Sequence, residues 1–148
     1  MMSPKDIPLA YLKKCQSRLK TLPIFLEDQN FSDVVRESQE IVELSSKGIL
    51  RMALIDPPHR HDVAKELLEA LPKLDKSFFH PIQELVTANH WLRREREMAF
   101  YGADDFDPTE GYSIQDAERA MAFAQLAVKT LRRLVEAKKK TPIHHKKR

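Results

Sequence analysis

Hydrophobic positions recur every three or four residues along most of the chain, which is the period of a helix with one buried face. The stretch 113–138 is the most regular. Its apolar positions alternate steps of three and four without a break: Ile114, Ala117, Met121, Ala124, Val128, Leu131 and Val135. No alternation of polar and apolar residues is long enough to build a sheet. The pattern therefore predicts an all-α protein with four or five helical segments.

Prolines, a glycine and capping residues divide the rest of the chain into further helices. Pro57 and Pro58 cannot continue a helix, and Gly102 suits a C-terminal cap. Ser113 with Asp116 three residues later forms a variant of the capping box. Four helices are predicted before it. The first begins near residues 4–6 and runs toward Pro23, and the others cover residues 31–54, 61–71 and 79–101.

The predicted helix 31–54 carries serines on its apolar face and charges on the other. Ser38, Ser45 and Ser46 share the face of the apolar stripe, where small side chains allow a neighbouring helix to approach closely. Glu43 and Lys47 are spaced as a favourable i,i+4 ion pair. We expect this pair to lie on a solvated surface.

Composition excludes several classes of protein. The chain has 148 residues, the size of one domain, and only 3 glycines, too few for a glycine-rich phosphate loop. The single cysteine, Cys15, cannot form an internal disulfide or a multi-thiolate zinc site, so we expect a reducing compartment, by default the cytoplasm. No run of about 18 apolar residues is present, which predicts no membrane helix. No cofactor is expected.

The positive charge is concentrated at the C-terminus. The net charge is +3, and residues 138–148 carry six cations and no acidic residue, which leaves residues 1–137 with −3. We therefore expect a helical bundle over residues 1–137 and a basic tail over 138–148. The tail is either a solvated end without a specific role or an arm that contacts phosphates or an acidic partner.

Polar residues interrupt the apolar face of the predicted helix 79–101. At about 100° per residue, Asn89 and Arg96 fall within the apolar arc and Arg93 lies at its edge, whereas Arg94 points to the surface. Burying an unpaired arginine lowers the stability of the fold by several kcal/mol. The guanidinium must therefore pair with a carboxylate, reach water in a groove or lie at a subunit interface. Either Arg96 pairs with an acidic residue and locks the bundle, or Arg93 and Arg96 line a groove that receives phosphate or RNA.

Histidines and acidic residues do not combine into a metal motif. His59, His61 and Asp62 stand at a proline turn before a helix, where we expect the aspartate to cap and the histidines to face solvent. His80 and His90 are ten residues apart, unlike the i,i+4 pair of a zinc protease. No metal site is therefore predicted.

Two stretches of the chain carry motifs that match one known domain family. In the C-terminal half, the run Trp-Leu-Arg-Arg-Glu-Arg-Glu-Met-Ala-Phe-Tyr-Gly at residues 91–102 is followed by Tyr112, Asp116, Ala117, Ala120 and Ala124. In the N-terminal half, residues 36–47 are similar to the family's helix with a Glu-Leu-x-x-Lys element. His61-Asp62-Val63 is similar to its His-Asp-Val after a proline turn. Together these motifs resemble the HEPN domain family, and the resemblance spans about Leu9 to Leu134.

The resemblance implies an up-and-down antiparallel bundle of four to five helices, commonly a homodimer, often paired with a small nucleotidyltransferase in a toxin–antitoxin-like system. It also implies a nucleotide- or RNA-associated role. Some members cleave RNA with an arginine followed after four to six residues by a histidine. In this chain four residues separate Arg96 from Tyr101, and the first histidine after Arg96 is His144.

The expected function is therefore nucleotide or RNA binding through Arg93, Arg96, Asn89 and Tyr101. Tyrosine is a poor general base at neutral pH, which argues against catalysis. The first alternative is a metal-independent ribonuclease that uses Arg96 and Tyr101. The second is a helical interaction scaffold without a ligand.

Overall fold

Residues 7–60, 62–101 and 111–140 are described by the computed structural model, and for residues 95–101 and 139–140 only the course of the backbone. All regular elements in these ranges are helical, and no strand occurs among them. The elements are α1 (Ile7–Leu19), α2 (Leu22–Glu27), α3 (Phe31–Met52), α4 (Ala64–Ala70), the 3₁₀ turns η2 (Leu71–Lys73) and η3 (Lys76–Phe78), α5 (Phe79–Tyr101) and α6 (Ile114–Lys140). The predicted all-α class is confirmed.

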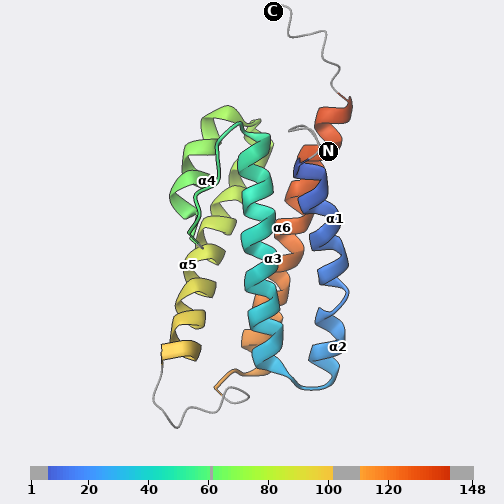
Figure 1. Cartoon of the computed structure of the whole chain (residues 1–148), viewed down its shortest axis with the longest axis vertical. Coiled ribbons are helices and arrows are strands. Elements are labelled where there is room, and N and C mark those ends of the chain that lie inside the picture. The colour runs from blue at the N-terminus through green and yellow to red at the C-terminus, as the bar shows by residue number, and fades with distance from the viewer. Residues whose placement is uncertain (1–6, 61, 102–110, 141–148) are drawn as a thin grey trace, which may run out of the picture.

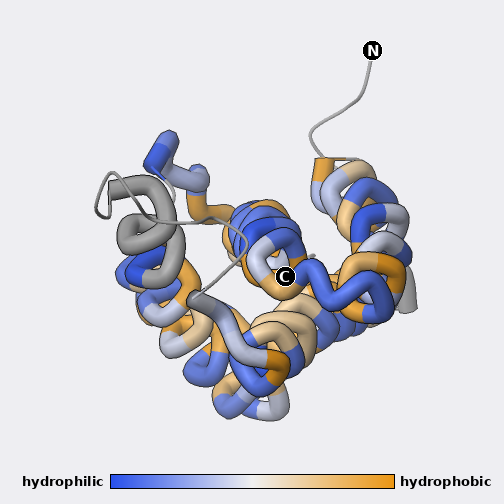
Figure 2. Tube along the Cα trace, turned by 90° about the horizontal axis from the view of Figure 1, so that it is seen from below, coloured by the Kyte–Doolittle hydropathy of each residue, from blue (hydrophilic) through white to orange (hydrophobic). Residues whose placement is uncertain are grey.

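The four long helices, α1, α3, α5 and α6, run along one common axis as an antiparallel bundle (Figure 1). Helices α3 and α6 form the centre and make the most extensive contact, with α1 on one side of them and α5 on the other. The short α4 packs against α5. Viewed from below, the coloured helices carry both hydrophobic and hydrophilic residues (Figure 2). A helix that buries one face needs both kinds, the hydrophobic residues on the buried face and the hydrophilic residues on the other.

Small residues allow the central helices to approach each other. Ser38, Ser45 and Ser46 of α3 are fully buried, as their place on the apolar face predicts. A Cβ atom added to Gly48 of α3 would lie 2.8 Å from Cδ2 of Leu131 on α6. The glycine is therefore required by close packing of side chains.

The chain between α1 and α3 differs from the prediction of one helix running toward Pro23. Helix α1 ends at Leu19, and Pro23 instead lies in the first turn of the separate helix α2. Proline fits there because a first-turn N–H has no partner within the helix. The predicted start near residues 4–6 lies outside the described residues.

Two helix ends adopt a left-handed residue without glycine. At the end of α3, Leu54 has φ 62°, and the N–H groups of Leu54 and Ile55 bond back to the carbonyls of Arg51 and Leu50. This hydrogen-bond pattern is a Schellman motif, in which glycine is the usual residue at the left-handed position. Gln29 has φ 59° at the corresponding position after α2.

The boundaries of the later helices follow the sequence signals closely. Helix α5 begins and ends where predicted, whereas α4 begins three residues later than predicted, at Ala64. The capping box is formed in both directions: the N–H of Ser113 donates to Asp116, and the N–H of Asp116 donates to the Ser113 hydroxyl. Helix α6 continues to Lys140, two residues past its predicted end at about residue 138.

Candidate functional site

A carboxylate just before α4 meets two cationic or potentially cationic side chains of α5. Oδ2 of Asp62 lies 3.4 Å from Nδ1 of His90 and 3.5 Å from Nη1 of Arg93. His90 and Arg93 are three residues apart and therefore share one face of α5. The three side chains form one cluster, which we call the Asp62 cluster.

The position of Asp62 is fixed by the backbone of α4. Its second oxygen, Oδ1, accepts the N–H of Ala64 at 2.9 Å, and the Asp62 side chain is only 14% exposed. Predicted from sequence as a capping residue, Asp62 thus satisfies an N–H at the start of the helix. A held carboxylate of this kind reduces the number of positions that the side chains of His90 and Arg93 can occupy.

Exposure distinguishes the members of the cluster. The side chains of Arg93 and His90 are 55% and 64% exposed, although the carboxylate that they share is mostly buried. Surface ion pairs at such distances contribute little to stability, about 0–1 kcal/mol. Because both side chains are more than half exposed, the cluster places two groups that carry N–H donors at the surface.

A buried amide fixes α5 against α3 next to the cluster. Nδ2 of Asn89 donates to the backbone oxygen of Leu85 at 2.8 Å and lies 3.3 Å from the hydroxyl of Ser46 on α3. Asn89 is 5% exposed. The sequence placed Asn89 within the apolar arc of this helix, and its burial agrees with that placement. The contact sets the position of the neighbouring His90.

The ion pair of α3 is formed but is not solvated. Nζ of Lys47 lies 3.2 Å from Oε2 of Glu43, and the two side chains are only 15% and 13% exposed. Gln39 also donates to Glu43, at 3.2 Å. The expectation of a solvated surface pair is therefore wrong for Glu43 and Lys47, which lie on a central helix that packs against α1, α5 and α6.

The structure describes the side chains of two of the four predicted site residues. Arg93 is in the cluster, Asn89 lies buried beside it, and Arg94 is exposed as expected. Arg96 and Tyr101 lie on the backbone of α5, but their side chains fall outside the described residues.

Sequence reasoning did not find His90 as a member of the site. It considered His90 and Asp62 separately, as candidates for metal ligands. The available signal was the three-residue spacing of His90 and Arg93, which places both on one face, but the partner carboxylate comes from a distant segment.

Among the described residues, no three side chains of the metal-ligating types are placed to share an ion. In the same part of the chain, no helix has the length and apolar character needed to span a membrane.

The comparisons with known proteins give one match. The family model of the HEPN domain matches residues 9–134, which is most of the chain and nearly the span of the resemblance. No curated protein and no solved structure matches. This family supports a nucleotide- or RNA-related role in general. The chain belongs to the HEPN domain family.

Proposed function

We propose that this protein binds the phosphate groups of RNA or of a nucleotide through the Asp62 cluster, with Arg93 as the main contact. The observation that carries the proposal is an exposed guanidinium whose position is set by a mostly buried carboxylate. A guanidinium keeps its charge at neutral pH and offers several N–H groups in one plane, which fits phosphate oxygens.

His90 and Asn89 have different parts in this proposal. The exposed imidazole of His90 contacts the same carboxylate as Arg93 and adds a ring nitrogen that donates or accepts a hydrogen bond beside it. Asn89 positions the middle of α5 through its contact with Ser46, because its amide nitrogen donates a hydrogen bond to that hydroxyl of α3. Arg96 and Tyr101 remain in the proposed site on the strength of the sequence.

The family also supplies the proposed partners. We propose a homodimer and a small nucleotidyltransferase as the protein partner, in a toxin–antitoxin-like pair. Size-exclusion chromatography with light scattering tests the first. Co-purification of the two proteins from one expression vector tests the second. A monomer at all concentrations contradicts the homodimer, and failure to co-purify contradicts the pairing.

Binding is tested by titrating labelled single-stranded RNA into the full chain and into Arg93→Ala over a range of salt concentrations. We expect affinity to fall about tenfold in the variant, because a charge-assisted hydrogen bond is lost. The logarithmic salt slope should become shallower by about 0.7, the value for one phosphate contact on a single strand.

Lys13→Ala serves as the matched control. Lys13 is exposed on α1, on the far side of the central helices from α5, so its removal subtracts one charge without touching the Asp62 cluster. Its affinity should stay close to that of the unaltered protein. Equal losses in Lys13→Ala and Arg93→Ala would show that only net charge matters. RNA and nucleotide titrations without binding would overturn the proposal.

A further inference from the structure

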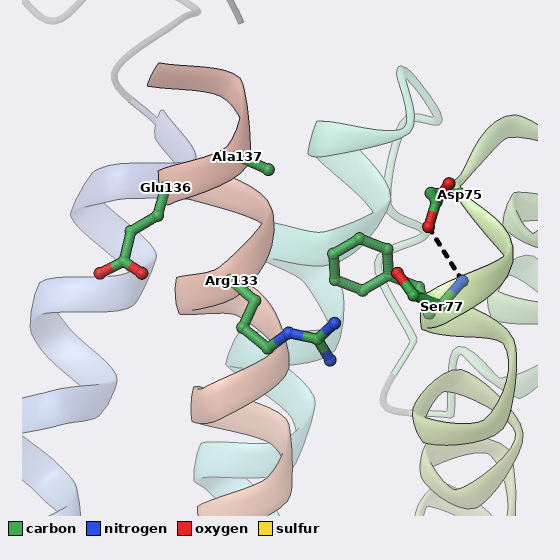
Figure 3. A pocket seen from close by; sticks show the side chains of 6 residues that line it. Asp75, Ser77, Arg133, Glu136 and Ala137 are labelled. Atoms are coloured by element: carbon green, nitrogen blue, oxygen red, sulfur yellow. Dashed lines mark hydrogen bonds between the residues drawn. The ribbon is translucent and has the colours of Figure 1, made fainter. Parts of the chain in front are cut away.

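Two arginines of α6 lie over aromatic rings, Arg119 over rings of α5 and α6 and Arg133 over a ring of η3. The guanidinium carbon of Arg119 is 4.6 Å from the ring centre of Trp91 and 5.4 Å from that of Phe123. The guanidinium carbon of Arg133 is 4.6 Å from the ring centre of Phe78, beside a shallow hollow near Asp75 and Ser77 (Figure 3). The two stacks are fourteen residues apart, about 21 Å along the helix.

The Arg119 stack is the more open to an incoming anion. Within the described part of the chain, Arg119 has no hydrogen bond or ion pair, so its contacts are with rings alone. Contact with the face of a ring leaves the N–H edges of a guanidinium available. Arg133, in contrast, lies near Asp75, and its positive charge helps to lower the pKa of that carboxyl after the hydrogen bonds from Ser77.

Trp91 and Phe123 add aromatic surface at the same place. Both rings are half-buried, with centres 6.1 Å apart and planes at 56°. Arg94 is exposed and follows Trp91 by three residues, so it lies about 60° from it around α5. Trp91 and Arg93 are about 200° apart by the same geometry. The aromatic surface is therefore distinct from the Asp62 cluster.

We propose that Trp91, Phe123, Arg119 and Arg94 form a second contact surface, on which single-stranded RNA stacks a base while the two arginines contact its phosphates. Bases stack on aromatic rings and on guanidinium planes, and this contact tolerates any sequence because every base has a π-face. An acidic peptide would use the arginines but gain nothing from the rings. RNA as the ligand rests on the proposed function, whereas the surface is a different one.

Trp91 is the single tryptophan of the chain, so intrinsic tryptophan fluorescence reports on this surface alone. The experiment titrates a short oligouridylate into the full chain and follows quenching of that fluorescence, with the anisotropy of a labelled copy as an independent measure of total binding. An abasic oligomer of the same length supplies phosphates without bases. Oligouridylate should quench the fluorescence, and the abasic oligomer should quench it much less.

Three variants separate stacking from charge. Arg119→Ala should weaken oligouridylate binding roughly 5- to 100-fold, the range found for loss of a stacking contact. Arg119→Lys keeps the charge but loses the planar group, and it should recover only part of the affinity. Arg132→Ala removes an exposed arginine of α6 that has no aromatic contact among the described residues, and its affinity should stay near the original. Near-ultraviolet circular dichroism checks that each variant keeps its packing.

Each remaining outcome contradicts one proposal in particular. RNA that binds without quenching, and equally well to Arg119→Ala, overturns this surface and leaves the Asp62 cluster intact. If Arg93→Ala loses all binding while quenching in Arg119→Ala is unchanged, this surface is again overturned and the Asp62 cluster remains. Fluorescence that changes with protein concentration before RNA is added indicates a second copy on the surface, and binding of polyglutamate instead of RNA indicates an acidic protein partner. Both results overturn the inference.

Discussion

Asp62 and Arg93 are 31 positions apart in the chain, yet Oδ2 of the aspartate lies 3.5 Å from Nη1 of the arginine. The same aspartate accepts the N–H of Ala64 at the start of α4. One side chain thus joins the start of α4 to the middle of α5, where the proposed phosphate contact lies. The separate effects of its two bonds can be measured.

Asp62→Ala should lower the free energy of unfolding by about 1 kcal/mol, the usual effect of losing a side-chain acceptor at a helix start. Asp62→Asn should lower it by less than half as much, because an amide oxygen can still accept the N–H of Ala64. Urea unfolding of both variants measures the difference. Equal losses would mean that the charge of Asp62 matters more to stability than the hydrogen bond.

Leu54→Gly should raise the free energy of unfolding by about 0.5–1 kcal/mol. Leu54 is 84% exposed and has φ 62°, so it gives up little buried surface and is relieved of left-handed strain. That strain is about 1–2 kcal/mol, and the greater freedom of glycine in the unfolded chain offsets part of the gain. Leu54→Ala keeps the strain and should give no such gain. If Leu54→Ala were stabilised as well, removal of the exposed leucine side chain, and not relief of strain, would explain the gain in the free energy of unfolding.

Gly48→Ala should destabilise the protein by about 1 kcal/mol in thermal or urea unfolding. The new Cβ would lie 2.8 Å from Cδ2 of Leu131 and 3.3 Å from Cβ of Tyr11. Overpacking costs about 1–3 kcal/mol, more than the gain of up to 1 kcal/mol from the helix propensity of alanine. In a Leu131→Val background the same change should cost less. An equal cost in both backgrounds would exclude the contact with Leu131 as the cause.

Cys15 should react slowly with thiol reagents in the folded protein and rapidly after unfolding. Its side chain is fully buried, and burial raises the pKa of the thiol above the ordinary value of 9.0. Above pH 9.0 the unfolded state therefore loses its thiol proton before the folded state does, so stability should fall as pH rises toward the folded pKa. Urea unfolding of the unaltered protein and of Cys15→Ala across this range measures the effect. Parallel pH curves would contradict it.

Purified protein should bind RNA without cleaving it when a metal chelator is present. In the sequence no histidine follows Arg96 at the spacing of the cleaving family members, and Tyr101 is a weak replacement as a base. Gel electrophoresis of labelled RNA after long incubation tests this. Cleavage that disappears in Arg96→Ala and in Tyr101→Phe would establish the ribonuclease alternative instead.

Local signals in the sequence determined the helices. The three-and-four spacing of α6 predicted a buried stripe, and its members Ala117, Ala124, Val128, Leu131 and Val135 are buried, whereas Ile114 is 44% exposed and Met121 is half-buried. The capping box at Ser113 formed as expected. These features depend on residues within a few positions of one another. Burial of Asn89 also followed from helix geometry. The same reasoning did not predict α2 as a separate helix or the left-handed conformation of Leu54. The residue types at these positions do not indicate the backbone conformation that the structure has there.

Only the tertiary structure decided which distant side chains meet. Asp62 finds His90 and Arg93 because the start of α4 packs beside the middle of α5, and helix periodicity carries no information about that register. Glu43 and Lys47 look like a solvated pair on a helical wheel, but the wheel describes one helix and not the number of its neighbours. Helix α3 packs against α1, α5 and α6, and Glu43 and Lys47 are mostly buried, whereas Arg36 on the same charged face is exposed.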